Sequence, residues 1–190
     1  MKKALVRISE SVWKLSADSN IYLLLLQEPV VIDTGSRKNR HLVETLLSKL
    51  VDFNAVEKVL FTHMHYDHTG NFDLFKNAEL FASRQEIEDF KKDPVDTVLN
   101  KDASDKLKNA AVKPLPKRIS ELEVVQTPGH TRGSVCFWYE KEKLLFSGDT
   151  LLRSGPGRVD LPTSAPSELQ KSLLRLLRYN CKKLCTGHDY

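Results

Sequence analysis

Three histidines and one aspartate lie within six residues of one another, directly after the apolar run 59–61. Side chains two residues apart in an extended chain project to the same face, so His63 and His65 can reach one metal ion together. Asp67 and His68 follow where the strand gives way to a turn, and they can therefore point toward a second ion. Imidazole and carboxylate groups at this spacing are typical of the start of a dinuclear hydrolytic metal site.

Three further candidate ligands come later in the chain, each in a short turn that contains a glycine. They are His130, Asp149 and His188. Each follows a strand-like segment, and open α/β proteins collect functional residues in the loops at the carboxyl ends of strands. Because a rigid sheet holds such loops in place, we expect these side chains to join the first cluster.

The order and context of these residues resemble the metallo-β-lactamase superfamily. The motif His63-x-His65-x-Asp67-His68 is followed in turn by His130, Asp149 and His188. The glyoxalase II-like branch (hydroxyacylglutathione hydrolase-like) is also similar in segments 127–134, 146–151 and 157–162, which read TPGHTRGS, FSGDTL and GRVDLP. The resemblance implies an α/β fold, a four-layer αβ/βα sandwich, formed by one domain over residues 1–190.

The resemblance also implies a role for each candidate ligand. His63, His65 and His130 would hold a first divalent ion, Asp67, His68 and His188 would hold a second, and Asp149 would bridge them. Zinc is the expected metal, with iron and manganese left open because His and Asp accept all three. The two ions would share a water and lower its pKa, and Asp67 would orient the resulting hydroxide for attack on an acyl carbon.

The acyl substrate is expected to be a thioester or a related ester or lactone. A thiolate leaves easily, since a thiol pKa is ~8.5, and the resemblance points to S-lactoylglutathione-type thioesters. Enzymes of that kind carry a C-terminal helical domain that grips glutathione, whereas this chain stops two residues after His188, which leaves glutathione recognition open. Four side chains beside the motifs could bind a substrate carboxylate or could equally be structural partners: Tyr66, Arg132, Arg153 and Arg158.

Two other activities stay open. Iron-dependent persulfide dioxygenases have similar sequences, including a run like 157–160, and would need one iron held by His63, His130 and Asp149. A phosphodiesterase or nuclease of the same superfamily is the second alternative, although we find no additional RNA-gripping segment in the chain. β-Lactam hydrolysis is disfavoured because nothing at the N-terminus, Met1-Lys2-Lys3 included, resembles an export signal.

Composition narrows the class of protein further. The 190 residues, 41% hydrophobic and 28% charged, suit one core of ordinary size. The longest apolar run, 21–26, is far below the ~20 residues that span a bilayer. The net charge of +4 is dispersed, so we expect a small-molecule substrate rather than a nucleic acid or a membrane. Three cysteines, an odd number, argue against a disulfide framework and favour a cytoplasmic location.

Two similar halves are expected to position these residues. The first half has strand-like segments at 4–8, 12–15, 21–26, 30–33, 56–61 and 79–82, with a helix over 38–51 and a polar helix over 84–92. The second half has strands at 123–127, 134–139, 144–147 and 183–186, and a helix that begins at Pro166. The polar, proline-bounded segment 93–117 is expected to be a solvated connection, with a lid or a substrate-facing insertion as the alternative.

Overall fold

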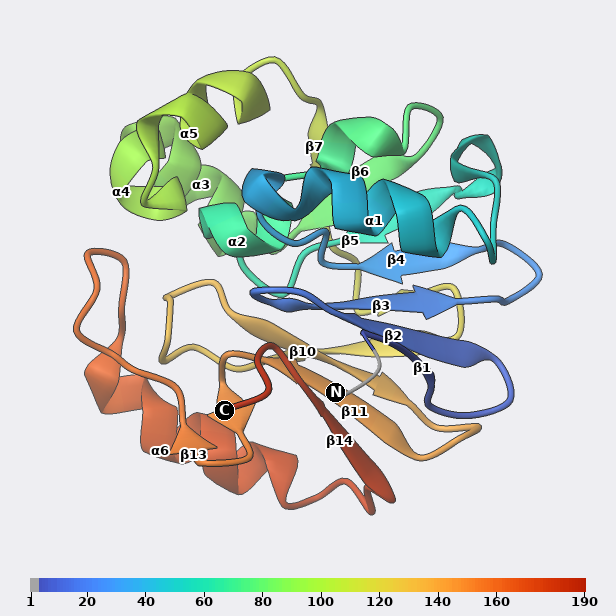
Figure 1. Ribbon diagram of the computed structural model, residues 1–190. Coiled ribbons are helices and arrows are strands. Elements are labelled where there is room, and N and C mark those ends of the chain that lie inside the picture. The colour runs from blue at the N-terminus through green and yellow to red at the C-terminus, as the bar shows by residue number, and fades with distance from the viewer. Residues whose placement is uncertain (1–3) are drawn as a thin grey trace.

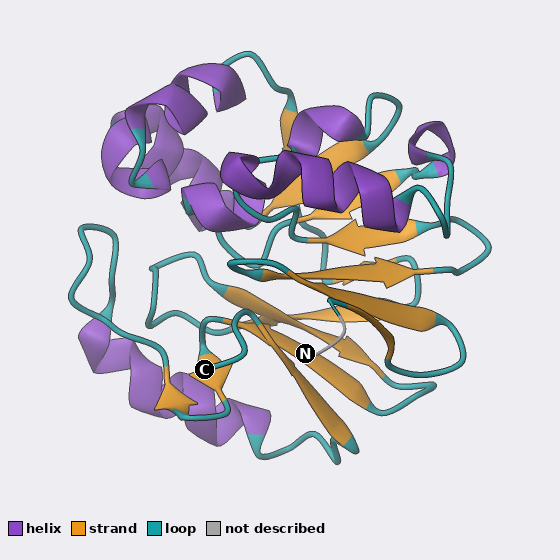
Figure 2. Cartoon of the chain, viewed as in Figure 1, coloured by secondary structure: helices purple, strands orange, loops and turns teal. Residues whose placement is uncertain are grey.

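Two β-sheets pack against each other and carry helices on their outer sides (Figure 1). The computed structural model describes residues 4–190, so Met1-Lys2-Lys3, on which part of the export-signal prediction rests, lie outside the described residues. Helices α1 to α5 gather on the first sheet and α6 lies on the second, which makes four layers (Figure 2). The predicted αβ/βα sandwich is confirmed.

The first sheet changes from antiparallel to parallel pairing along its width. Its seven strands run in chain order, β1-β2-β3-β4-β5-β6-β7. Strands β1 to β4 pair antiparallel, whereas β4, β5, β6 and β7 pair parallel, so the carboxyl ends of those four strands share one edge. The strands are β1 (Leu5–Arg7), β2 (Val12–Ser16), β3 (Asn20–Leu24), β4 (Val30–Ile32), β5 (Lys58–Leu60), β6 (Glu79–Ala82) and β7 (Val112–Pro114).

The second sheet has five strands in the order β14-β11-β10-β9-β8. Strand β14 pairs parallel with β11, while the other neighbouring strands of this sheet pair antiparallel. The strands are β8 (Arg118–Ile119), β9 (Leu122–Gln126), β10 (Val135–Tyr139), β11 (Leu144–Gly148) and β14 (Lys183–Thr186), and a separate hairpin joins β12 (Leu151–Leu152) to β13 (Gly155–Pro156).

The helices are short. They are α1 (Arg40–Leu47), α2 (Tyr66–Thr69), α3 (Arg84–Lys92), α4 (Pro94–Val98), α5 (Lys101–Leu107) and α6 (Pro166–Leu176), with 3-10 turns η1 (Arg37–Asn39), η2 (Phe53–Ala55) and η3 (Phe72–Leu74). Helix α1 ends before residue 51, where the sequence predicted its end. The backbone there closes into a turn in which Leu50 and Val51 both donate to the Leu47 carbonyl. Within residues 4–190, no helix combines the length and the apolar character that crossing a bilayer requires.

The prediction that 93–117 is a solvated connection is wrong. The segment contains α4, α5 and β7, and β7 extends the first sheet beside β6. Asp93 caps α4 by accepting from two backbone N–H groups, and Asn100 caps α5 by accepting from the backbone N–H of Ala103. Val98 and Leu107 are buried in the core under the helices. Each helix is too short for hydrophobic periodicity to show, so its caps are the only local signal.

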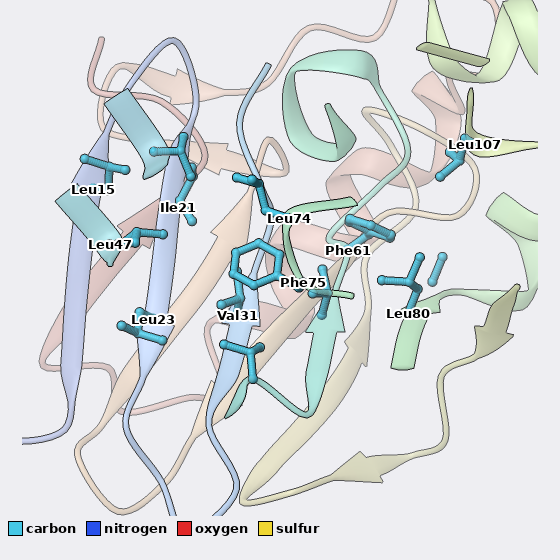
Figure 3. Packing of buried hydrophobic residues seen from close by; sticks show 14 of the residues in the cluster. Leu15, Ile21, Leu23, Val31, Leu47, Phe61, Leu74, Phe75, Leu80 and Leu107 are labelled. Atoms are coloured by element: carbon cyan, nitrogen blue, oxygen red, sulfur yellow. The ribbon is translucent and has the colours of Figure 1, made fainter. Parts of the chain in front are cut away.

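The core has one layer on each face of the first sheet. Strand β3 shows the division, since Ile21 and Leu23 face the helices while Tyr22 and Leu24 face the second sheet, as the alternation of a strand requires. Figure 3 shows the helix-side layer, in which Phe61 lies at the end of β5. Burial of each such large side chain contributes about 1.5–3 kcal/mol. The strand that leads into the metal motif is therefore firmly held.

Candidate metal centre

The seven predicted ligands meet at one edge of the two sheets. Asp67 and His68 lie in the short helix α2, and the other five lie in the loops that follow β5, β9, β11 and β14, so both sheets contribute. Their ligand atoms form three groups, each with all atoms within 4.8 Å of one another. We call His63, His65 and His130 the first triad and Asp67, His68 and His188 the second triad; the third group joins Asp149 to one histidine of each, His63 and His68. That these side chains bind metal stays a prediction.

The first triad has the spacing of ligands around one ion. The Nε2 atom of His130 lies 3.1 Å from the Nδ1 atom of His65. Two nitrogens each about 2.0 Å from a tetrahedral zinc ion would be about 3.3 Å apart. The ring centroid of His63 lies 4.5 Å from that of His65 and 4.7 Å from that of His130, and both ring pairs are arranged edge-on. Three imidazoles thus converge on a volume that suits one cation.

Within residues 4–190, several buried polar atoms of the centre have no hydrogen-bond partner. They include Nε2 of His63 and His68, and Oδ1 of Asp149. Unpaired buried polar atoms cost free energy and are rare in folded proteins. A divalent cation would satisfy these groups, and imidazole with carboxylate is a donor set that zinc, iron and manganese accept. The residues present therefore fit a bound metal.

Asp149 lies between the two triads. Its Oδ1 atom is 3.5 Å from Nε2 of His68, and its Oδ2 atom is 3.6 Å from Nε2 of His130 and 3.3 Å from Nε2 of His188. Asp67 completes this side of the centre, with its Oδ2 atom 3.4 Å from Nε2 of His188. One carboxylate that faces both triads has the placement that bridging would require.

Backbone carbonyls hold two of the histidines in place. His130 donates from Nδ1 to the carbonyl of Arg158 at 2.8 Å, and His188 donates from Nδ1 to the carbonyl of Asp18 at 2.6 Å. A neutral imidazole that donates from Nδ1 keeps an unprotonated Nε2. Each bond therefore fixes both the tautomer and the ring orientation that a metal ligand needs.

Asp33, which is not among the residues predicted from the sequence, does the same for His68. Its Oδ2 atom lies 2.8 Å from Nδ1 of His68, and its carboxylate also accepts from the backbone N–H and the hydroxyl of Thr62. Asp33 has a left-handed backbone with φ of 55°. The available signal was an aspartate directly after the strand 30–32, in an Asp-Thr-Gly turn.

Burial and charge set the protonation of the first triad. Burial lowers the pKa of His65 to about 3, and burial with the neighbouring histidines holds the pKa of His63 well below its ordinary value. The pKa of His130 is also lowered, chiefly by burial. These three imidazoles are therefore neutral at pH 7, which is the form that binds a metal ion.

The second triad has the opposite electrostatics. Burial opposes a charge on His68, but the nearby carboxylates, led by Asp33, raise its pKa to about 9. Burial likewise opposes a charge on His188, and hydrogen bonds to Asp149 and Asp67 raise its pKa to about 11. This side of the centre attracts positive charge, and a divalent cation would take the place of these protons.

The four predicted substrate-binding residues do not lie together. Arg132 donates from Nε to buried Asp89 at 3.0 Å, and Arg158 pairs with Asp160 at 2.7 Å, so both have structural partners. Arg153 lines a small separate cavity, whereas Tyr66, 37% exposed, lines a larger one of about 410 Å³ beside α2. Of the four, Tyr66 borders the larger cavity, and a role for any of them in substrate binding stays a prediction.

Comparison with known proteins identifies the family of this chain. The family model of the metallo-beta-lactamase superfamily matches residues 18–188. The chain belongs to this superfamily. A probable metallo-hydrolase of Methanocaldococcus jannaschii is 30% identical to this chain, and the match covers 90% of this chain and 87% of that relative.

Two further proteins similar to this chain have names that describe a reaction or a bound metal. A hydroxyacylglutathione hydrolase of Methylobacillus flagellatus is 32% identical over 93% of this chain, which spans 64% of that relative. A protein crystallised in a di-iron-bound form superposes with a TM-score of 0.72 at 28% identity, covering 93% of this chain and 91% of that one. The predicted membership is confirmed, and the chain is a metallo-hydrolase superfamily protein with glyoxalase II relatives.

Proposed function

We propose that this protein is a dinuclear metal-dependent hydrolase that cleaves thioesters, with related esters and lactones in the same class. The observation that carries the proposal is the convergence of two ligand triads on one carboxylate, Asp149, from loops of both sheets. Similarity to hydroxyacylglutathione hydrolases at about 30% identity supports the thioester class.

The proposed cofactor is a pair of divalent ions, zinc in the first instance, held by the first and second triads and shared by Asp149. Bound there, the ions would supply Lewis acidity and lower the pKa of a water molecule. Burial opposes a charge on Asp67, but His68 and His188 lower its pKa, and a cation in their place would favour the carboxylate for the same electrostatic reason. It can therefore accept a hydrogen bond from the attacking water and orient it toward the acyl carbon.

The leaving group and the rest of the substrate also have a place in the proposal. A thiolate leaves without a strong general acid, because the thiol pKa is ~8.5. The cavity beside Tyr66 is bounded by Phe72, by the acidic Asp102 and by three basic side chains, of which Arg37 and Lys38 pair with Asp73 and Asp18 and the third is Lys106. A cavity of this size suits the non-reacting part of a small acyl compound.

A cytoplasmic location belongs to the same proposal. The three cysteines, Cys136, Cys181 and Cys185, are free thiols. Free thiols are typical of proteins that work in a reducing compartment.

Metal analysis combined with a substrate panel tests the proposal. Protein purified without added metal is analysed for elemental content and assayed with thioesters, lactones, a β-lactam, a phosphodiester and a persulfide. We expect two divalent ions per chain and turnover of thioesters. One iron per chain, with oxygen consumed in the presence of the persulfide and no hydrolysis, would identify a dioxygenase instead. Turnover of the phosphodiester alone would identify a nuclease-type enzyme.

A further inference from the structure

Helix α3 presents a buried polar face to the metal centre. Ser83, its N-cap, and two carboxylates, Glu86 and Asp89, follow one another at three-residue spacing, and all three are at most 2% exposed. Residues three apart on a helix lie on one face. The polar helix expected from the sequence therefore buries part of its polar side. Carboxylates are almost never fully buried unless they are paired, so these two need an explanation.

Glu86 bonds to both loops that hold the first triad. Its Oε2 atom accepts from the backbone N–H of Met64 at 2.7 Å, and its Oε1 atom accepts from the hydroxyl of Thr131 at 2.6 Å. Met64 stands between two histidines of the triad, and Thr131 directly follows the third. One carboxylate thus joins a loop of the first sheet to a loop of the second.

The use of this carboxylate differs from what its local sequence favours. Ser83-x-x-Glu86 is the pattern of a capping box, in which the glutamate bonds back to the N-cap backbone. The Ser83 hydroxyl does accept from the Glu86 backbone N–H at 3.1 Å. The carboxylate of Glu86, however, is directed to Met64 and Thr131. Its contacts therefore serve the two loops and not the helix end.

The loop that carries His130 packs tightly on α3. A Cβ atom added at Gly133 would lie 2.6 Å from the backbone nitrogen of Glu86 and 2.6 Å from the hydroxyl of Ser83, so the loop has no room to move closer. The Thr131 hydroxyl also lies 2.8 Å from that of Ser134. A backbone bond from Val135 to the Thr62 carbonyl joins the roots of the two loops. Glu86 joins their histidine-bearing parts.

We propose that Glu86 is a positioning residue that sets the spacing of the first triad by tying its two loops together. The proposal rests on the proposed function only in that the first triad binds a metal ion. A low-dielectric interior makes each of these hydrogen bonds stronger than it would be in water, so one side chain can hold the two loops together. The second triad has its own supports, since Asp33 and the Asp18 carbonyl orient two of its members.

Metal titration of variants tests this role without reliance on activity. Cobalt(II) binding is followed by its visible absorption, and elemental analysis gives the stoichiometry. We expect Glu86→Ala to weaken binding at the first triad by about 10–100-fold, the usual effect of removing a support of metal ligands. Binding at the second triad is expected to stay within about twofold of wild type on the same grounds. Circular dichroism checks that the variant is folded.

Asp89→Asn is the matched control. Asp89 is a buried carboxylate of the same helix and pairs with Arg132 of the same loop, but its hydrogen bonds go to Arg132 and Gln85 and not to Met64. Its metal affinity is expected to remain within about twofold of wild type. An equal loss in Asp89→Asn would overturn the proposal, because helix packing alone would then account for the effect.

Thr131→Val removes one arm of the tie at nearly constant volume and covers the case in which Glu86→Ala does not fold. Its affinity is expected to fall between those of wild type and Glu86→Ala, and the double variant is expected to lose no more than Glu86→Ala alone. Such non-additivity is the sign that two residues act through each other. Wild-type cobalt affinity in both single variants would overturn the proposal. Two bound ions in the wild type without thioester turnover would overturn the proposed function alone.

Discussion

Hydrogen bonds at Nδ1 orient three histidines of this centre. His130 and His188 donate from Nδ1 to carbonyls, and His68 meets the carboxylate of Asp33, so each presents Nε2 to the interior. The partner atoms come from residues at least 28 positions away in the chain. Ligand identity is thus a property of single residues, while ligand orientation is a property of the folded chain.

Asp149→Ala tests the shared carboxylate. We expect loss of at least one of two metal ions and a fall in turnover of at least about 100-fold, because Asp149 faces histidines of both triads. Elemental analysis and the thioester assay measure the two effects. Asp105→Asn, a change of a carboxylate on α5 that pairs with the surface lysines Lys101 and Lys108, should alter neither. Full metal content and full activity in Asp149→Ala would show that Asp149 does not bridge.

Among the elements, α4 and α5 show how a polar segment can belong to the core. Helix caps start both helices, and the buried apolar side chains Val98 and Leu107 anchor them against the first sheet. Helix α5 and its N-cap Asn100 also line the cavity beside Tyr66, through Asp102, Ala103 and Lys106. The segment 93–117 therefore links the stability of the first half to the surroundings of the centre.

Leu107→Ala measures how firmly α5 is docked. Leu107 is 1% exposed, so its truncation should cost about 2–5 kcal/mol of the free energy of unfolding. Leu177→Ala is the control, because Leu177 is 79% exposed and its truncation should cost less than about 0.5 kcal/mol. Urea unfolding of both variants gives the comparison. Equal small losses would mean that α5 is not part of the cooperative core.

An ion pair ties the start of α1 to η3 and predicts a pH effect. Burial opposes a charge on Asp73, but hydrogen bonds from Arg37 and Arg40 lower the pKa of Asp73 below its ordinary value. A lowered folded-state pKa means that the stabilisation is present above the unfolded-state pKa and is lost as the pH falls through the folded-state pKa. Because all three side chains are partly exposed, the effect should be at most about 1 kcal/mol.

Urea unfolding of chelator-treated protein between pH 7 and pH 2 measures this effect. Asp73→Asn should be less stable than wild type at pH 7, and the difference should shrink toward zero as the pH falls below the folded-state pKa of Asp73. A difference that is constant over the whole range would assign the loss to packing and not to charge.

The molecule as a whole is two sheets whose loops meet at the candidate metal centre. The first sheet supplies His63, His65, Asp67 and His68, and the second supplies His130, Asp149 and His188. A ligand that binds only the folded state adds its binding free energy to the stability of that state. Bound metal would therefore stabilise the contact between the two halves of the chain.

Metal removal is expected to lower the midpoint of thermal unfolding. At a free metal concentration of 100 times the dissociation constant, each site would contribute about 2.7 kcal/mol. Calorimetry before and after dialysis against a chelator measures the change, and re-addition of zinc should restore the original midpoint. An unchanged midpoint in protein shown to have lost its metal would mean that the centre does not join the halves.

Local patterns predicted most strands and all seven converging side chains, because alternation and turn residues are visible over a few positions. They misjudged 93–117, where Val98 and Leu107 are apolar anchors in helices too short to show a period. They also did not decide whether Arg132 and Arg158 bind substrate or form structural contacts. The ion pairs of both arginines became visible in the folded structure.

The sequence by itself determined the chemistry of this protein, since imidazole and carboxylate groups after strand-like segments define the donor set wherever they converge. The tertiary structure decided which donors share a partner and how they are aimed. Glu86 meets Thr131 across 45 positions and His68 meets Asp33 across 35, and neither contact has a local signature. Both depend on how strands and sheets pack, which is set by burial summed over the whole core and not by any short run of residues.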